Sequence, residues 1–92
     1  MLDHNEYFEG AVQSVGFERN GRRTTVGVID AGSFHFGTAA AERMTVLSGE
    51  LWVESADGQS RHYPAGTVFE VAANSGFDAK ADAPVAYLCE YL

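Results

Sequence analysis

Regularly spaced turn signals are the feature that most limits the folds open to this chain. Glycine-containing turns recur about every 8–12 residues, among them Asn20-Gly21, Asp57-Gly58 and Ala73-Asn74-Ser75-Gly76. The runs between them are short and rich in β-branched and aromatic residues, and no window sustains a helical period. The pattern predicts about eight or nine short strands and an all-β sandwich or barrel. We expect residues 1–92 to form one domain.

The stretch from Glu42 to Val53 is expected to be the centre of this barrel. Two strand-like runs are joined there through Ser48-Gly49, which predicts a hairpin. A return strand entered through Pro64-Ala65-Gly66 follows. In small double-sheet barrels, a polar group beside such a hairpin points into an apolar bowl. We therefore expect the functional site in a bowl next to Glu42.

Composition and charge exclude several classes of function. The 92 residues carry 6 Lys+Arg and 13 Asp+Glu, a net charge of −7, which argues against a nucleic-acid partner. The single cysteine, Cys89, cannot form an intramolecular disulfide and indicates a reducing compartment. The sequence shows no leader and no long apolar run, so we expect a soluble, cytoplasmic protein without a membrane partner.

The residue types needed for a metal site or a covalent nucleophile are sparse. The histidines, His4, His35 and His62, lie in different segments, and a catalytic metal usually needs three converging ligands. Only His35 is a candidate for the bowl, and we expect no metal. Cys89 lies in an apolar strand, where a cysteine usually behaves as a small hydrophobe, and no serine has an adjacent histidine.

Glu42 is the most informative polar residue. It either solvates the rim of the barrel or points inward, where it must be hydrogen-bonded or neutral and can bind hydroxyls or handle protons. Hydroxyls at strand ends or turns could donate to an anion or a sugar, although most such groups cap turns: Thr38, Thr45, Ser48 and Ser75. Aromatic rings could stack on a flat ligand or fill the core: Phe36, Phe69, Phe77 and Tyr87.

Arginines are the candidates for holding an anion. Arg43 and Arg61 are expected to be the positive charges nearest the bowl, with Arg43 facing away from Glu42 by strand alternation. The arginines around the Asn20-Gly21 hairpin, Arg19, Arg22 and Arg23, are expected to remain solvated.

Two spaced motifs resemble those of the cupin superfamily: Glu42-x6-Gly49, and Gly58-x5-Pro64-x-Gly66. The His-x-His that usually precedes the glutamate is absent, and Phe69 stands at the second motif's histidine position. Four blocks resemble a narrower family, the small single-cupin pyrimidine/purine nucleoside phosphorylases: residues 5–8, 14–17, 42–49 and 87–92. The segment 72–76 departs from that family's usual proline-bearing turn.

The resemblance implies a cupin barrel, a homodimer, no cofactor, and phosphorolysis of nucleosides with inorganic phosphate as co-substrate and broad tolerance for the base. On that reading Glu42 lies near the ribose or the developing cation. The hydroxyls Thr38, Thr45, Ser48 and Ser75 are candidates for phosphate, and Phe36, Phe69, Phe77 and Tyr87 are candidates for the base. Three alternatives stay open: a non-catalytic, metal-free cupin that binds a small sugar or nucleoside, a metal-dependent cupin built on His35, and a structural dimer module.

Overall fold

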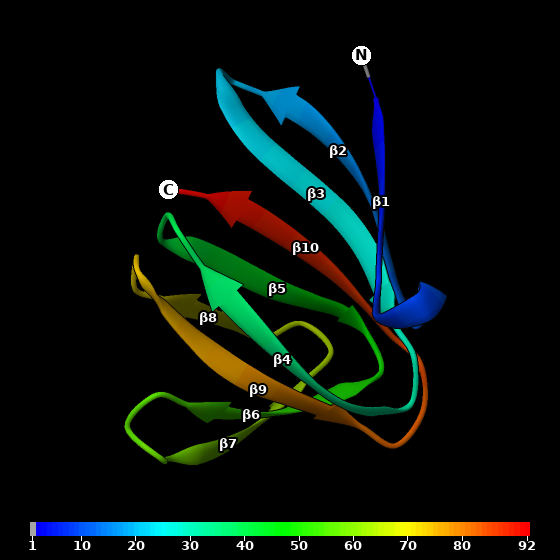
Figure 1. The fold of residues 1–92 in the computed structure, drawn as a ribbon, viewed down its shortest axis with the longest axis vertical. Coiled ribbons are helices and arrows are strands. Elements are labelled where there is room, and N and C mark those ends of the chain that lie inside the picture. The colour runs from blue at the N-terminus through cyan, green and yellow to red at the C-terminus, as the bar shows by residue number, and fades with distance from the viewer. Residues whose placement is uncertain (1) are drawn as a thin grey trace.

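A computed structural model describes residues 2–92, which form two antiparallel sheets and one 3₁₀ turn (Figure 1). The six-stranded sheet has the order β1 (Asp3–Tyr7), β2 (Val12–Arg19), β3 (Arg22–Ile29), β10 (Val85–Tyr91), β5 (Glu42–Ser48) and β8 (Val68–Val71). The four-stranded sheet has the order β4 (Gly32–Thr38), β9 (Ser75–Ala81), β6 (Glu50–Ser55) and β7 (Ser60–Pro64). The 3₁₀ turn, η1 (Phe8–Gly10), joins β1 to β2. The expected all-β cupin barrel is confirmed.

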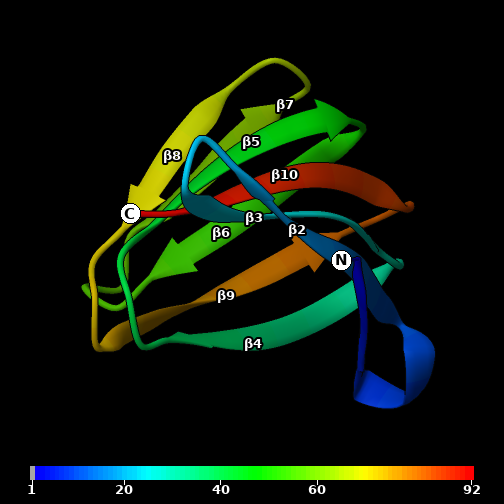
Figure 2. The same ribbon diagram turned by 90° about the horizontal axis from the view of Figure 1, so that it is seen from above.

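The two sheets form layers whose facing sides make the core, and β4 and β9 lie across from β3 and β10 (Figure 2). Side chains alternate between buried and less buried along β2 and β10 up to the last residues of each strand, as strands with one covered face require. The core is made by inward-facing residues of both sheets: Val12, Ile29, Met44, Val46, Leu51, Val53, Phe69, Phe77, Ala79, Ala81, Val85, Tyr87 and Cys89. The prediction that Cys89 is buried is confirmed.

The tight turns follow the sequence signals with one exception. Asn20 and Gly21 both have positive φ, 55° and 73°, and close the predicted two-residue hairpin between β2 and β3. The hairpin predicted at Ser48-Gly49 is wrong, because β5 pairs with β10 and β8 whereas β6 pairs with β7 and β9. Gly49, at φ 88°, instead turns the chain from one sheet to the other in a place where a Cβ would lie 3.0 Å from the Pro84 carbonyl oxygen.

One further difference concerns the number of strands. The opening segment supplies the edge strand β1, so residues 2–92 hold ten strands rather than the expected eight or nine. Between β4 and β5, at Ala39–Ala41, the backbone is held by a bond from the Asn74 amide to the Ala39 carbonyl oxygen at 3.2 Å. Within residues 2–92, no helix has the length and apolar character needed to cross a membrane.

Candidate functional site

A cavity of about 440 Å³ opens between the two sheets beside η1, and we call it the bowl. Its residues come from the concave side of the six-stranded sheet, from β4 and β9 of the facing sheet, and from η1. They are Asn5, Tyr7, Phe8, Ser14, Arg23, Thr25, His35, Phe36, Gly37, Glu42, Met44, Phe77, Tyr87, Cys89 and Tyr91. The volume falls in the range of about 300–1,000 Å³ that small-molecule sites occupy.

Glu42 begins β5 and points into the bowl. It is half-buried and pairs across the strands with Tyr91 of β10. The Cys89 thiol donates a hydrogen bond to Glu42 Oε1 at 3.4 Å. Burial raises the pKa of the Glu42 carboxyl, and the bond from Cys89 acts in the opposite direction. Of the two orientations left open by the sequence, the inward one is therefore the one found, and Glu42 offers an oxygen to a ligand in the bowl.

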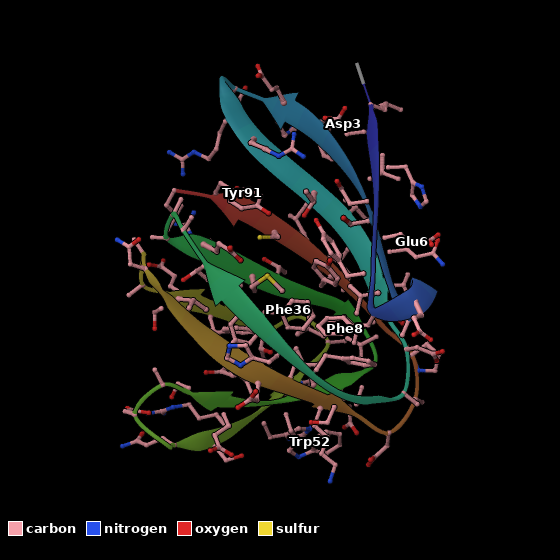
Figure 3. All side chains as sticks on the ribbon, viewed as in Figure 1. Asp3, Glu6, Phe8, Phe36, Trp52 and Tyr91 are labelled. Atoms are coloured by element: carbon pink, nitrogen blue, oxygen red, sulfur yellow. The ribbon has the colours of Figure 1, made fainter. Side chains whose placement is uncertain are left out.

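Aromatic rings form one wall of the bowl. Phe36 of β4 and Phe77 of β9 stack with centroids 5.3 Å apart and 19° between their planes. Phe8 reaches across from η1 and packs edge-on to Phe36, with ring centroids 5.9 Å apart. Figure 3 labels both residues, which lie close together. Phe8 is 46% exposed and has φ 53°, an unusual conformation for a bulky residue. This wall gives a flat ligand an apolar surface to stack on.

Polar side chains of the six-stranded sheet form the opposite wall. The Tyr87 hydroxyl lies over the backbone of Gly27, where a Cβ would come within 2.6 Å of it, and Ser14 lines the same wall. Burial raises the pKa of both Tyr87 and Tyr91 to about 12. Both phenols are therefore protonated at neutral pH and can donate hydrogen bonds.

Arg23 is exposed, as the sequence predicted, but its position at the bowl was not predicted. Its side chain lines the bowl, lies against Gly16 and forms an ion pair with Asp3, Nη1 to Oδ2, at 3.2 Å. Arg43 faces away from Glu42, as expected, and pairs with Glu70 at 3.3 Å, whereas Arg61 lines a separate cavity; the expectation that these two are the positive charges nearest the bowl is wrong. Within residues 2–92, Arg23 is the one arginine or lysine that lines the bowl.

The structure brings together four of the nine candidate site residues: Glu42, Phe36, Phe77 and Tyr87. The other five lie elsewhere. Thr38 Oγ1 donates to the Ala72 carbonyl oxygen at 2.7 Å and accepts from the Ser75 amide at 3.0 Å, which ties down the turn before β9. Thr45 pairs with Val68 away from the bowl, and Ser48 is exposed at the end of β5.

Phe69 and Ser75 line a second cavity of about 280 Å³, on the far side of Phe77. Phe69 stacks there on Tyr63 with ring centroids 4.5 Å apart. The residues that sequence reasoning missed, besides Arg23, are chiefly Phe8 and Tyr91. Tyr91 could have been found from strand alternation, since it follows Tyr87 and Cys89 at every second position of β10.

The three histidines lie apart and are engaged in separate contacts. His4 contacts Gln13, and the ring of His62 stacks on Trp52. His35 reaches the bowl's edge, but its Nδ1 is 2.9 Å from a carboxylate oxygen of Asp78 on an exposed surface. The described part of the chain, residues 2–92, contains no group of three or more His, Cys, Asp or Glu side chains arranged to hold a metal ion.

Comparisons with known proteins agree over the whole chain. A family model described as pyrimidine/purine nucleoside phosphorylase matches residues 2–91. A protein of that name from Anaeromyxobacter sp. is 69% identical over 93 residues, covering 100% of this chain and 89% of the relative. Another from Sorangium cellulosum is 65% identical over 94 residues, covering 100% of both. A solved structure of a Vibrio parahaemolyticus protein of unknown function superimposes with a TM-score of 0.96 at 42% identity, covering 100% of this chain and 99% of that one.

Proposed function

The chain belongs to the pyrimidine/purine nucleoside phosphorylase family, and we propose that the bowl around Glu42 is where its reaction takes place. A phosphate oxygen attacks the anomeric carbon of the nucleoside's sugar. The bond between that carbon and the base nitrogen breaks, and its electron pair leaves with the base, which takes up a proton. The products are the free base and a pentose 1-phosphate, so the enzyme is a pentosyltransferase, a kind of glycosyltransferase.

One observation supports this assignment of the site most directly: a single half-buried carboxylate, Glu42, lies in the same cavity as an aromatic wall and a polar wall. The transition state of phosphorolysis carries positive charge on the sugar, and a fixed carboxylate beside it stabilises that charge. Glu42 also accepts hydrogen bonds from ribose hydroxyls. Phosphate is itself the nucleophile, so the proposed reaction requires neither an enzyme nucleophile nor a cofactor.

The aromatic wall accommodates the base. Phe36 and Phe77 are held in place by their own stack, and Phe8 adds a third ring from the η1 side. Stacking makes no use of the hydrogen-bonding edge of a base, and it is worth about 1–3 kcal/mol per base in other proteins. A wall of this kind fits an enzyme that accepts both purine and pyrimidine nucleosides.

A homodimer is the proposed assembly, and the outer face of the six-stranded sheet supports it. Residues that face outward there are cross-strand partners in one row over five strands: Val15, Val26, Leu88, Thr45 and Val68. Val26 is 39% and Val68 51% exposed in the isolated chain. A row in which four of five side chains are apolar is typical of a surface that packs against another protein. Val26→Lys should give monomers in sedimentation experiments, whereas Lys in place of exposed Ser33 on the other sheet should not.

A cytoplasmic location is also proposed. It agrees with the single, buried, unpaired Cys89, because disulfide-rich chains are characteristic of oxidising compartments.

The decisive experiment incubates the purified protein with uridine, inosine or guanosine, with and without phosphate, and measures free base by chromatography. Base release that requires phosphate supports the proposal. Release without phosphate would indicate a hydrolase. No release from folded protein would leave a nucleoside-binding module.

The Glu42→Gln variant then tests the carboxylate. We expect kcat to fall by about 10²–10³-fold, the usual effect of removing one preorganised electrostatic contact. Glu54→Gln is the matched control, because it removes the same charge from an exposed residue of β6 that does not line the bowl. Equal rates in the two variants would remove Glu42 from the mechanism.

A further inference from the structure

Resting on the proposed function, we propose that Arg23 binds the phosphate co-substrate, and that Asp3 is the counter-ion which phosphate displaces. The site would take inorganic phosphate in the polar half of the bowl, on the concave side of β1, β2 and β3.

The strand register places Arg23 at this position. Asp3 of β1 lies opposite Gly16 of β2, and Gly16 lies opposite Thr25 of β3, two residues beyond Arg23 on the same face. Arg23 therefore reaches diagonally over Gly16 toward Asp3. A Cβ on Gly16 would lie 2.7 Å from Arg23 Nη2 and 3.1 Å from its Cζ. The missing side chain at Gly16 is what lets the guanidinium lie on the backbone at the bowl.

The guanidinium keeps donors for a second anion. Its pairing with Asp3 uses Nη1, and a guanidinium has five N–H groups in a planar fork that matches phosphate oxygens. The ion pair is also exposed to solvent, with about half of each side chain accessible. Exposed pairs contribute little stability because solvent screens them, so a dianion can replace Asp3 at small cost.

Neighbouring donors complete a cradle. Ser14, Thr25, Asn5 and Tyr91 line the same cavity and come from the same sheet. Burial is the main cause of the raised pKa of Tyr91, Glu42 raises it further, and Arg23 lowers it. The hydroxyl of Tyr91 therefore stays protonated and is available as a donor in this cavity.

The carboxylate of Glu42 and the guanidinium of Arg23 leave room for the sugar and the phosphate to react between them. Glu42 and Arg23 line one cavity, yet among residues 2–92 the ion pair of Arg23 is with Asp3 and not with Glu42. A sugar near Glu42 then has its anomeric carbon between the carboxylate and the incoming phosphate. A net charge of −7 repels phosphate at long range, but screening limits the repulsion by distant carboxylates to about 8–10 Å, so a local cation such as Arg23 can hold the anion.

The test measures inosine phosphorolysis against phosphate concentration at constant ionic strength, in the wild type and three variants. Arg23→Gln should raise the KM for phosphate about 10- to 100-fold, as expected for a lost charged hydrogen bond, and leave the KM for inosine unchanged. Arg22→Gln is the matched control, because it removes the same charge from the preceding residue of β3, which does not line the bowl. It should change neither the KM for phosphate nor the KM for inosine. Asp3→Asn should lower the KM for phosphate, because it releases the guanidinium.

An unchanged phosphate KM in Arg23→Gln, or an equal rise in Arg22→Gln, would overturn the proposal. If Arg23→Gln does not fold, Asp3→Asn still decides, and an unchanged or higher phosphate KM in that variant counts against Arg23. Broadening of the phosphate ³¹P resonance by the wild type and by Arg23→Gln separates this proposal from the proposed function. Broadening lost with Arg23 supports the phosphate site even where no base is released, and broadening kept in the variant refutes it even in an active enzyme.

Discussion

Gly27→Ala is expected to destabilise the protein strongly, although it adds only one methyl group. Gly27 lies on β3 between Tyr87 of β10 and Ser14 of β2. The new Cβ would stand 2.6 Å from the Tyr87 hydroxyl and 2.7 Å from the Gln13 carbonyl oxygen, well below the 3.4–4 Å of ordinary contact. The carbonyl belongs to a paired strand and cannot move without breaking the ladder. The ring of Tyr87 must therefore leave its position.

The size of the effect follows from two opposing contributions. Overpacking costs about 1–3 kcal/mol, and the upper end applies because the new Cβ meets two atoms at once. Replacing a strand glycine returns about 0.5–1 kcal/mol of backbone entropy. The free energy of unfolding should thus fall by about 2 kcal/mol, which lowers Tm by about 8–16 °C in a domain of this size.

Urea unfolding followed by tryptophan fluorescence measures this change, since Trp52 is the single tryptophan. Gly37→Ala is the matched control: Gly37 also lies in a strand and lines the bowl, but a Cβ there meets nothing within 4 Å. It should be neutral or slightly stabilising. A Gly27→Ala variant as stable as Gly37→Ala would refute the reasoning from close contacts.

Three further predictions follow from the bowl. Gly16→Ala should displace only the flexible end of Arg23, so the phosphate KM should rise while the urea midpoint stays unchanged; a lowered midpoint would contradict this. Phe8→Ala should weaken nucleoside binding about 5- to 100-fold in titration calorimetry through lost stacking, and equal affinities would remove Phe8 from the base site. Glu42→Gln should stabilise the protein at pH 7 relative to the wild type, and less so at pH 4. Burial raises the pKa of the Glu42 carboxyl above 4.5. The wild-type protein therefore has the full stability that protonated Glu42 allows below pH 4.5, and it loses that stability as the pH rises through the folded-state pKa. Urea unfolding at both pH values checks this, and a pH-independent difference would count against it.

Local signals in the sequence were enough to predict the fold class and several turns. Asn20-Gly21 needs only its own backbone preferences to close a hairpin, and the apolar alternation of β10 is enough to bury Cys89. Ser48-Gly49 shows the limit of local signals. A turn residue indicates that the chain changes direction, but it does not determine which strand pairs with β5. That strand is β10, which lies far along the chain.

The candidate site was predictable in part for the same reason. Glu42 stands out because apolar residues follow it, and Phe36 and Phe77 follow from alternation on their strands. Arg23 could not be found in this way. Its approach to the bowl depends on a glycine on the neighbouring strand and on an acidic partner on the strand after that, a relation that exists only once three strands are in register. The hydroxyls of Thr38 and Ser75 were predicted to donate to an anion. The Thr38 hydroxyl instead makes both of its hydrogen bonds with the backbone of a turn.

The place of β10 between β3 and β5 has a consequence for how the chain folds. Both neighbouring strands, β3 and β5, precede β10 in the sequence, and β4 to β9 lie between β3 and β10. Until β10 arrives, both neighbours present unpaired edges, which are sites where chains associate wrongly. Such long-range pairing also makes folding slow. Because β10 carries Tyr87, Cys89 and Tyr91 into the bowl, the step that closes the sheet is also the step that completes the site. A nascent chain should therefore depend on β10 for solubility and for activity at the same moment.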